Sequence, residues 1–182
     1  MEAHAHYAVY AGNALIIDEH GNVAKKQTLP KARELNFDDI FEHKKAGIRA
    51  PTAMIQTHIL HEVGGYNPNI PLEDIYMWLK ISSKGYLFYV TEDVLSYYRK
   101  HSSNQSKNIL FMADCITLIY ADYKQYPQHD RVLNTLLINL FFKAAKRGYH
   151  NALPVLRRVP MRYYNSKVLL GFCYWLINRL KT

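Results

Sequence analysis

The sequence predicts an α/β fold: a partial mixed sheet with flanking helices, followed by a helical C-terminal subdomain. In the first part of the chain, runs rich in strand formers at residues 7–17, 85–90 and 94–98 alternate with helical patterns. Beyond Lys107 the apolar residues recur at helical spacing instead. The chain has 182 residues, which suits one core-bearing domain with a helical appendage. The expected domains are therefore residues 1–107 and residues 108–182.

The elements expected in the first domain begin with a strand at residues 7–17. Turn chemistry at residues 18–22, followed by Val23, predicts that this strand continues into a hairpin. Residues 29–35 are expected to form a connecting loop. The remaining expected elements are a helix at 37–45, a strand at 50–55, a short helix that Thr57 caps, strands at 85–90 and 94–98, and helices at 108–126, 130–148 and 163–180.

Two carboxylates lie at the start of the helix that is expected after Pro71. Glu73 and Asp74 fall in its first turn, and apolar residues follow at helical spacing at Ile75, Trp78 and Leu79. Free backbone N–H groups and the helix dipole stabilise ionised carboxylates there, so at least one should be charged at neutral pH and suited to act as a general base. Acidic residues are also common in first turns for capping alone. The dipeptide by itself leaves both interpretations open.

Other polar pairs carry weaker signals. Glu92 and Asp93 lie between two strand-like runs and predict a turn without chemistry. Asp38 and Asp39 open the helix expected at residues 37–45 and are interpreted as its cap. A helix could place His58 and His61 on one face for a metal, but no third ligand is near them in the sequence, so a surface or core role is favoured.

The formal charge of +8 is concentrated in the second domain. Residues 1–107 contain 12 Lys/Arg and 12 Asp/Glu, whereas residues 108–182 contain 11 Lys/Arg and 3 Asp/Glu. A basic surface favours anionic partners such as phospholipid headgroups, lipid diphosphates or phosphate-bearing glycans, although a plain solvated face is the alternative. We expect no nucleic-acid partner, because no recognition motif is present and the tyrosines lie largely in core-like strands.

The cysteines and the apolar segments indicate the cellular compartment and the relation of the chain to a membrane. Cys115 and Cys173 lie in apolar helical runs and are expected to be buried thiols in a reducing compartment. Residues 1–6 lack the pattern of a secretory signal. Residues 168–177 are apolar apart from Gly171, but about ten residues cannot cross roughly 30 Å of hydrocarbon. This segment either lies on an acidic membrane surface or packs on the preceding helices, and packing is favoured.

Four short segments between residues 64 and 106 follow a recognisable order. They are Gly64-Gly65-Tyr66, Glu73-Asp74, Gly85-Tyr86-Leu87-Phe88 and Tyr98-Arg99-Lys100-His101-Ser102-Ser103-Asn104-Gln105-Ser106. In this order the chain resembles the acceptor-side half of family-2 glycosyltransferases of the GT-A fold. That family has a GG-aromatic turn, an acidic pair that opens a helix, a G-Y-x-aromatic strand and a Y-R-x-H-x-x-N-x-S segment. The resemblance covers roughly residues 7–107.

The resemblance implies an inverting transfer of a sugar from a nucleotide-diphosphate donor to a hydroxyl of a glycan or lipid-linked acceptor, in bacterial cell-envelope polysaccharide biosynthesis. Asp74 matches the position of the family's base, and Glu73 would orient it or bind the acceptor. The residues implied to contact substrate or the leaving diphosphate are Arg99, His101, Ser106 and Trp78. A divalent metal, Mg or Mn, is also implied, with His101 as a candidate ligand.

The chain departs from the family pattern in its donor half. It contains no Asp-x-Asp triplet, and no βαβ nucleotide-binding unit precedes residue 7. The resemblance therefore implies that the chain begins just past the metal-binding aspartates, binds metal weakly or not at all, and transfers little sugar by itself. The expected location is the cytoplasm or the inner face of the membrane. The alternative function is a non-enzymatic interaction module whose basic helical tail binds a membrane or a protein.

Overall fold

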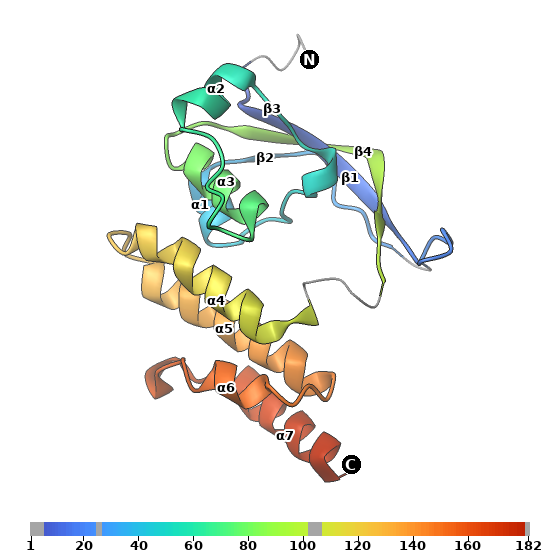
Figure 1. The fold of residues 1–182 in the computed structure, drawn as a ribbon, viewed down its shortest axis with the longest axis vertical. Coiled ribbons are helices and arrows are strands. Elements are labelled where there is room, and N and C mark those ends of the chain that lie inside the picture. Colours follow the sequence, from blue (N-terminus) through green and yellow to red (C-terminus); the bar gives the residue numbers. More distant parts are fainter. Residues whose placement is uncertain (1–5, 25–26, 102–106, 181–182) are drawn as a thin grey trace. The chain divides into compact units, whose positions relative to one another are not determined.

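The computed structural model describes residues 6–24, 27–101 and 107–180. The chain forms two compact units, Met1–Asn104 and Gln105–Thr182. The described part of the first unit contains a four-stranded mixed sheet with helices, and that of the second is helical (Figure 1). The predicted α/β class is therefore confirmed.

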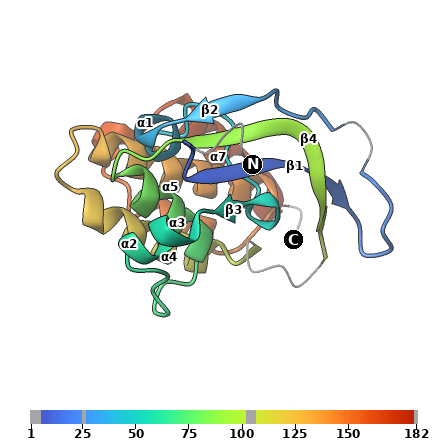
Figure 2. The ribbon, with the colours of Figure 1, turned by 90° about the horizontal axis from the view of Figure 1, so that it is seen from above.

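The sheet of the first unit has the strand order β2-β4-β1-β3 (Figure 2). Strands β1 and β4 pair in parallel, whereas β3 runs antiparallel to β1 and β2 antiparallel to β4. The elements of this unit are β1 (Val9–Ile17), β2 (Arg33–Leu35), α1 (Phe37–Phe41), the 3-10 helix η2 (Ala50–Thr52), β3 (Met54–Ile55), α2 (Thr57–Glu62), α3 (Glu73–Ser82) and β4 (Phe88–Arg99).

A buried apolar cluster holds α3 against one face of this sheet. Val9 and Ala11 of β1 share that face because side chains two apart in a strand point the same way. The cluster also contains Met77, Trp78 and Ile81 of α3 and Phe88 and Val90 of β4. The packing of α3 onto the two central strands fixes the position of its N-terminal turn, where the two carboxylates lie.

After the turn the chain pairs back on β1 as predicted, over a short stretch of the described residues: an antiparallel bridge joins Ile17 and Val23, and the Ala24 N–H donates to the Ile16 carbonyl at 2.9 Å. The side-chain amide of Gln27 adds to this backbone pairing. Its Oε1 accepts the backbone N–H of Ile16 at 2.7 Å, and its Nε2 donates to the Ile16 carbonyl at 3.0 Å. These bonds satisfy both backbone groups of Ile16. The turn at residues 18–22 does form, with Gly21 at a φ of 91°.

The turn predicted at Glu92 and Asp93 is wrong, because β4 continues through both residues with an irregular register opposite β1. Two neighbouring residues of β1 accommodate the irregularity. A Cβ on Gly12 would lie 2.6 Å from Leu95 Cγ, so this close approach requires glycine. Asn13, 3% exposed, donates from Nδ2 to the Glu92 carbonyl at 2.9 Å. The polar pair thus marks a bulge inside one strand and not the end of a strand.

Two further elements are shorter than predicted. Helix α1 ends at Phe41 instead of Lys45, and His43 beyond it has a φ of 54°. The capping role of the Asp38-Asp39 pair is confirmed, because Asn36 and Asp39 form a capping box. Of the strand expected at residues 50–55, Met54 and Ile55 form β3, because η2 with Pro51 precedes them.

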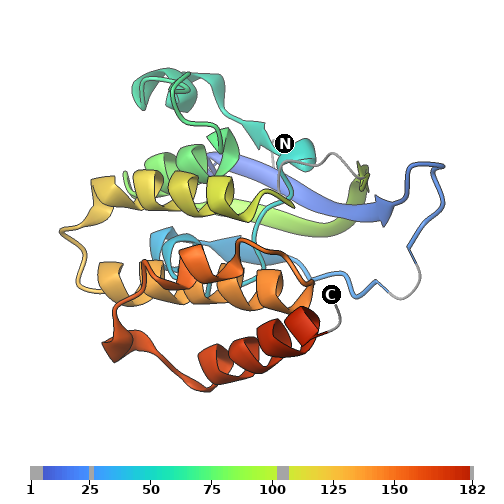
Figure 3. The same ribbon diagram turned by 60° about the horizontal axis from the view of Figure 1, so that its bottom comes forward.

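The second unit is built around α5, which contacts its other helices (Figure 3). Its elements are α4 (Ile109–Tyr120), the 3-10 helix η4 (Ala121–Tyr123), α5 (His129–Lys146), α6 (Ala152–Leu156), the 3-10 helix η5 (Met161–Tyr163) and α7 (Ser166–Leu180). Phe141 and Val155 lie fully buried in its core. Gln128 occupies the N-cap of α5. The prediction of two buried thiols is confirmed for Cys115 and wrong for Cys173, which is exposed.

Candidate functional site

The acidic pair opens α3 as predicted. The helix begins at Glu73 after the N-cap residue Leu72, whose side chain makes no capping bond, and Leu72 O accepts the first helical bond from Tyr76 N–H. Both carboxylates therefore lie in the first turn, where backbone N–H groups lack helical partners. Glu73 is exposed and Asp74 is half-buried, so the two acids have different surroundings.

The Asp74 carboxyl is in a more apolar setting than an ordinary capping acid. Its Oδ1 accepts the Ile75 backbone N–H at 2.7 Å, which favours the ionised form. Burial outweighs this bond and, together with the charge of Glu73, raises the pKa of Asp74 above its ordinary value. This direction is opposite to the one that capping and the helix dipole alone predict. A carboxylate destabilised by burial is a better proton acceptor than a solvated one.

The Gly64-Gly65-Tyr66 segment places α3 by reversing the chain after α2. Gly64 and Gly65 both have positive φ, 78° and 63°, which glycine adopts without strain. Their N–H groups donate to the carbonyls of His61 and Leu60 at the end of α2. Lys80 of α3 then donates from Nζ to the Gly65 carbonyl at 3.2 Å. The glycine turn thus ties the end of α2 to the helix that carries Asp74.

The Gly85-Tyr86-Leu87-Phe88 segment connects α3 to β4. Gly85 has a φ of 89°, Tyr86 donates from its hydroxyl to Glu62 Oε2 at 2.6 Å, and Phe88 is fully buried. Trp78, predicted to contact substrate, is 8% exposed, and its ring lies edge-on to Phe88 with centroids 5.9 Å apart. We assign Trp78 to the core and do not retain it as a substrate contact.

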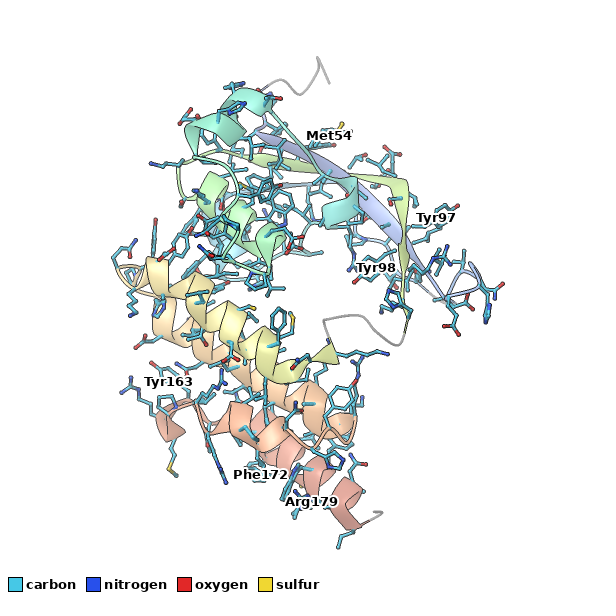
Figure 4. The ribbon with its side chains drawn as sticks, in the orientation of Figure 1. Met54, Tyr97, Tyr98, Tyr163, Phe172 and Arg179 are labelled. Atoms are coloured by element: carbon cyan, nitrogen blue, oxygen red, sulfur yellow. The ribbon has the colours of Figure 1, made fainter. Side chains whose placement is uncertain are left out.

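Arg99 ends β4 beside the turn that follows β1, because the parallel register pairs it with Ile17. Its Nη1 donates to the carbonyls of Asp18 and Glu19 at 3.1 and 2.8 Å. The end of β4 lies far along the sheet from helix α3, which packs on the sheet face near the start of β4 (Figures 1 and 2). Tyr97 and Tyr98, which precede Arg99, project to opposite sides of β4 (Figure 4). The structure therefore does not bring Arg99 together with Asp74.

The remaining predicted site residues follow β4. His101 is exposed just beyond its end, and Ser106 lies outside the described residues. His58 and His61 are both exposed on α2. No group of three His, Cys, Asp or Glu side chains that could hold a metal ion occurs among residues 6–24, 27–101 and 107–180. The divalent ion implied by the resemblance thus has no ligand set among these residues.

Sequence reasoning missed a cavity of about 490 Å³ in the first unit, lined by residues of β1 and of the loops at 27–33 and 46–49. Two guanidinium groups line it, from Arg33 and Arg49, and no carboxylate is among its described lining residues. Burial and the charge of Arg49 lower the pKa of Arg33. Arg33 is fixed by bonds from Nε, Nη1 and Nη2 to the carbonyls of Ala46, Lys31 and Gly47. The two positive charges favour an anionic group such as a phosphate or carboxylate, and neither arginine belongs to a motif that could have revealed the cavity.

No protein-family model matches the chain. No curated protein matches it either. Within the described part of the chain, every helix is too short or too polar to cross a bilayer.

Proposed function

We propose that this chain is the acceptor-binding and base-bearing part of an inverting, family-2-like glycosyltransferase of the GT-A fold. The observation that carries the proposal is the Asp74 carboxyl, which lies in the first turn of α3 with its pKa raised by burial. The order of the four motif segments along residues 64–106 supports it. The mixed sheet, with parallel β1 and β4 beside antiparallel β2 and β3, is compatible with such a domain.

The proposed chemistry is a single displacement. Asp74 accepts the proton of an acceptor hydroxyl, and the hydroxyl oxygen forms a bond to the anomeric carbon of the donor sugar. The bond from that carbon to the nucleotide diphosphate breaks on the opposite face, and the diphosphate leaves with the electron pair. Because the oxygen attacks from the face opposite the leaving group, the product has the inverted anomeric configuration. The exposure of Glu73 beside Asp74 supports a contact between Glu73 and the acceptor.

Positive charge must stabilise the departing diphosphate. The resemblance implies a diphosphate-binding role for Arg99, His101 and Ser106. Because the end of β4 lies away from α3, we do not assign Arg99 or His101 to the step in which Asp74 acts. The cavity lined in part by Arg33 and Arg49 offers a place for an anionic group of a substrate. No step is routed through a metal, because the described residues supply no ligand set.

The test joins the chain to the nucleotide-binding half of a family-2 glycosyltransferase that contains an Asp-x-Asp motif. Transfer to a panel of glycan and lipid-linked acceptors is measured with a panel of nucleotide-diphosphate sugars, and NMR determines the anomeric configuration of each product. We expect transfer above that of the donor half alone, with inverted configuration. Retained configuration, or no transfer beyond the donor half alone, would contradict the proposal.

A further inference from the structure

Helix α7 has an apolar face that the rest of the described chain does not cover. The residues of this α7 outer face are Leu169, Leu170, Cys173, Leu176, Ile177 and Leu180, and all six are exposed. Leu169 is 70% exposed and Leu180 is 87% exposed. Their spacing follows the 3.6-residue helical period, so they form one continuous stripe along the helix. An exposed apolar stripe of this length marks an interaction surface.

The opposite face of α7 packs on α5, which fixes the direction of the α7 outer face. A Cβ on Gly171 would lie 2.4 Å from Phe141 Cε1, so the two helices approach closely at this point. Phe172 projects from α7 (Figure 4), and its ring centroid lies 5.8 Å from that of Phe141. Asn178 donates from Nδ2 to the Ala145 carbonyl at 2.8 Å. These contacts turn the α7 outer face away from α5.

Basic side chains lie along both borders of the α7 outer face. At helical spacing, Lys167 borders one side of the stripe and Arg179 the other. Lys167 Nζ donates to Asn139 Oδ1 at 2.6 Å, and the Arg179 guanidinium lies 5.0 Å from the centroid of the Trp175 ring. Helix α7 contains no Asp or Glu, and residues 108–182 contain 11 Lys/Arg against 3 Asp/Glu.

We propose that α7 docks the protein on an anionic lipid surface, with the helix parallel to the membrane plane and the α7 outer face among the acyl chains. Leucines on one face with bordering cations and a nearby Trp are the features of an interfacial helix. The 15 residues of α7 rise about 22 Å, less than the roughly 30 Å of hydrocarbon, so the helix lies in the interface and does not span it. A second copy of the chain fits less well, because it would bring two basic units together. This inference does not depend on the glycosyltransferase proposal.

The test is flotation with lipid vesicles of phosphatidylcholine alone and of phosphatidylcholine mixed with phosphatidylglycerol. At about 0.1 M salt, where screening extends over roughly 10 Å, we expect the wild-type chain to float with the anionic vesicles and to remain in the dense fraction with the neutral ones. The triple variant Leu169→Ser, Leu176→Ser, Leu180→Ser should lose at least about tenfold in vesicle affinity. Lys167→Gln combined with Arg179→Gln should weaken binding and reduce its salt dependence.

A matched control uses two leucines of equal exposure. Leu176 on α7 and Leu118 on α4 are each 52% exposed. Leu176→Ser should weaken flotation and Leu118→Ser should not, while circular dichroism shows that both variants remain folded. The proposal is overturned if wild type does not bind anionic vesicles, if the triple variant floats as well as wild type, or if both single variants weaken binding equally. A wild-type dimer that the triple variant abolishes, without vesicle binding, would assign the surface to a second copy.

Discussion

Replacing Asp74 by asparagine is expected to lower the rate of sugar transfer by at least about 100-fold, because general base catalysis contributes roughly 10²- to 10⁴-fold. Asparagine keeps the size of the side chain and can still accept the Ile75 N–H, but it cannot take a proton from the acceptor. Transfer is measured with saturating donor and acceptor in the fusion that carries the donor half. Unchanged turnover would show that Asp74 is not the base.

The control for Asp74→Asn is a residue of the other acidic pair, Glu92-Asp93. Glu92 is exposed, and its backbone carbonyl, not its side chain, receives the bond from Asn13. Glu92→Gln therefore removes one negative charge from the same unit and leaves the bulge intact, so we expect turnover close to wild type. A loss as large as that of Asp74→Asn would mean that net charge, and not a specific base, controls the reaction.

The core of the second unit gives the largest expected effect on stability. Phe141 of α5 is fully buried, and its ring fills the space beside Gly171 of α7. Phe141→Ala removes a large buried ring and leaves a cavity, so the free energy of unfolding should fall by about 3–5 kcal/mol. The measurement is urea unfolding followed by circular dichroism. A loss below about 1 kcal/mol would contradict the close packing of α7 on α5.

Gly171→Ala tests the same contact, and its expected effect on the free energy of unfolding has the opposite sign to the effect in an exposed helix. In an exposed helix this substitution stabilises by about 1 kcal/mol, but here the new Cβ collides with the Phe141 ring and should destabilise by about 1–3 kcal/mol. In the Phe141→Ala background the collision is gone, and Gly171→Ala should become neutral or stabilising. Gly47→Ala is the control, because nothing lies within 4 Å of its added Cβ. Equal effects of Gly171→Ala in both backgrounds would contradict the account.

The sequence was sufficient for elements whose signals are local. Pro71 and the acidic pair predicted the start of α3, and Asp38-Asp39 predicted a cap. It was insufficient where a contact between strands decides the local structure. Gly12 and Asn13 of β1 convert the turn expected at Glu92 and Asp93 into a bulge. This outcome depends on the pairing of β1 with β4, which no local pattern specifies.

The candidate site shows the same limit. The position of Asp74 in the first turn of α3 could be predicted, but the direction of its pKa shift depends on burial by residues that are not its neighbours in sequence. Helical spacing placed Trp78 on the same segment as the acids without showing that its face is turned toward the sheet. Arg99 lies by the β1 turn because of the parallel register. The Arg33 and Arg49 cavity forms from two loops without a motif.

The most direct test of Asp74 as a proton acceptor is a carbon-13 NMR titration of its side-chain carboxyl. Burial raises its pKa, so the charged form is disfavoured in the fold, and stability falls as the pH rises through the window between the unfolded and the raised folded pKa. Asp74→Asn should therefore melt no lower than wild type at neutral pH. We predict a titration midpoint above the ordinary range of aspartate. A midpoint at or below that range would identify Asp74 as a helix-capping carboxylate and contradict its role as the base.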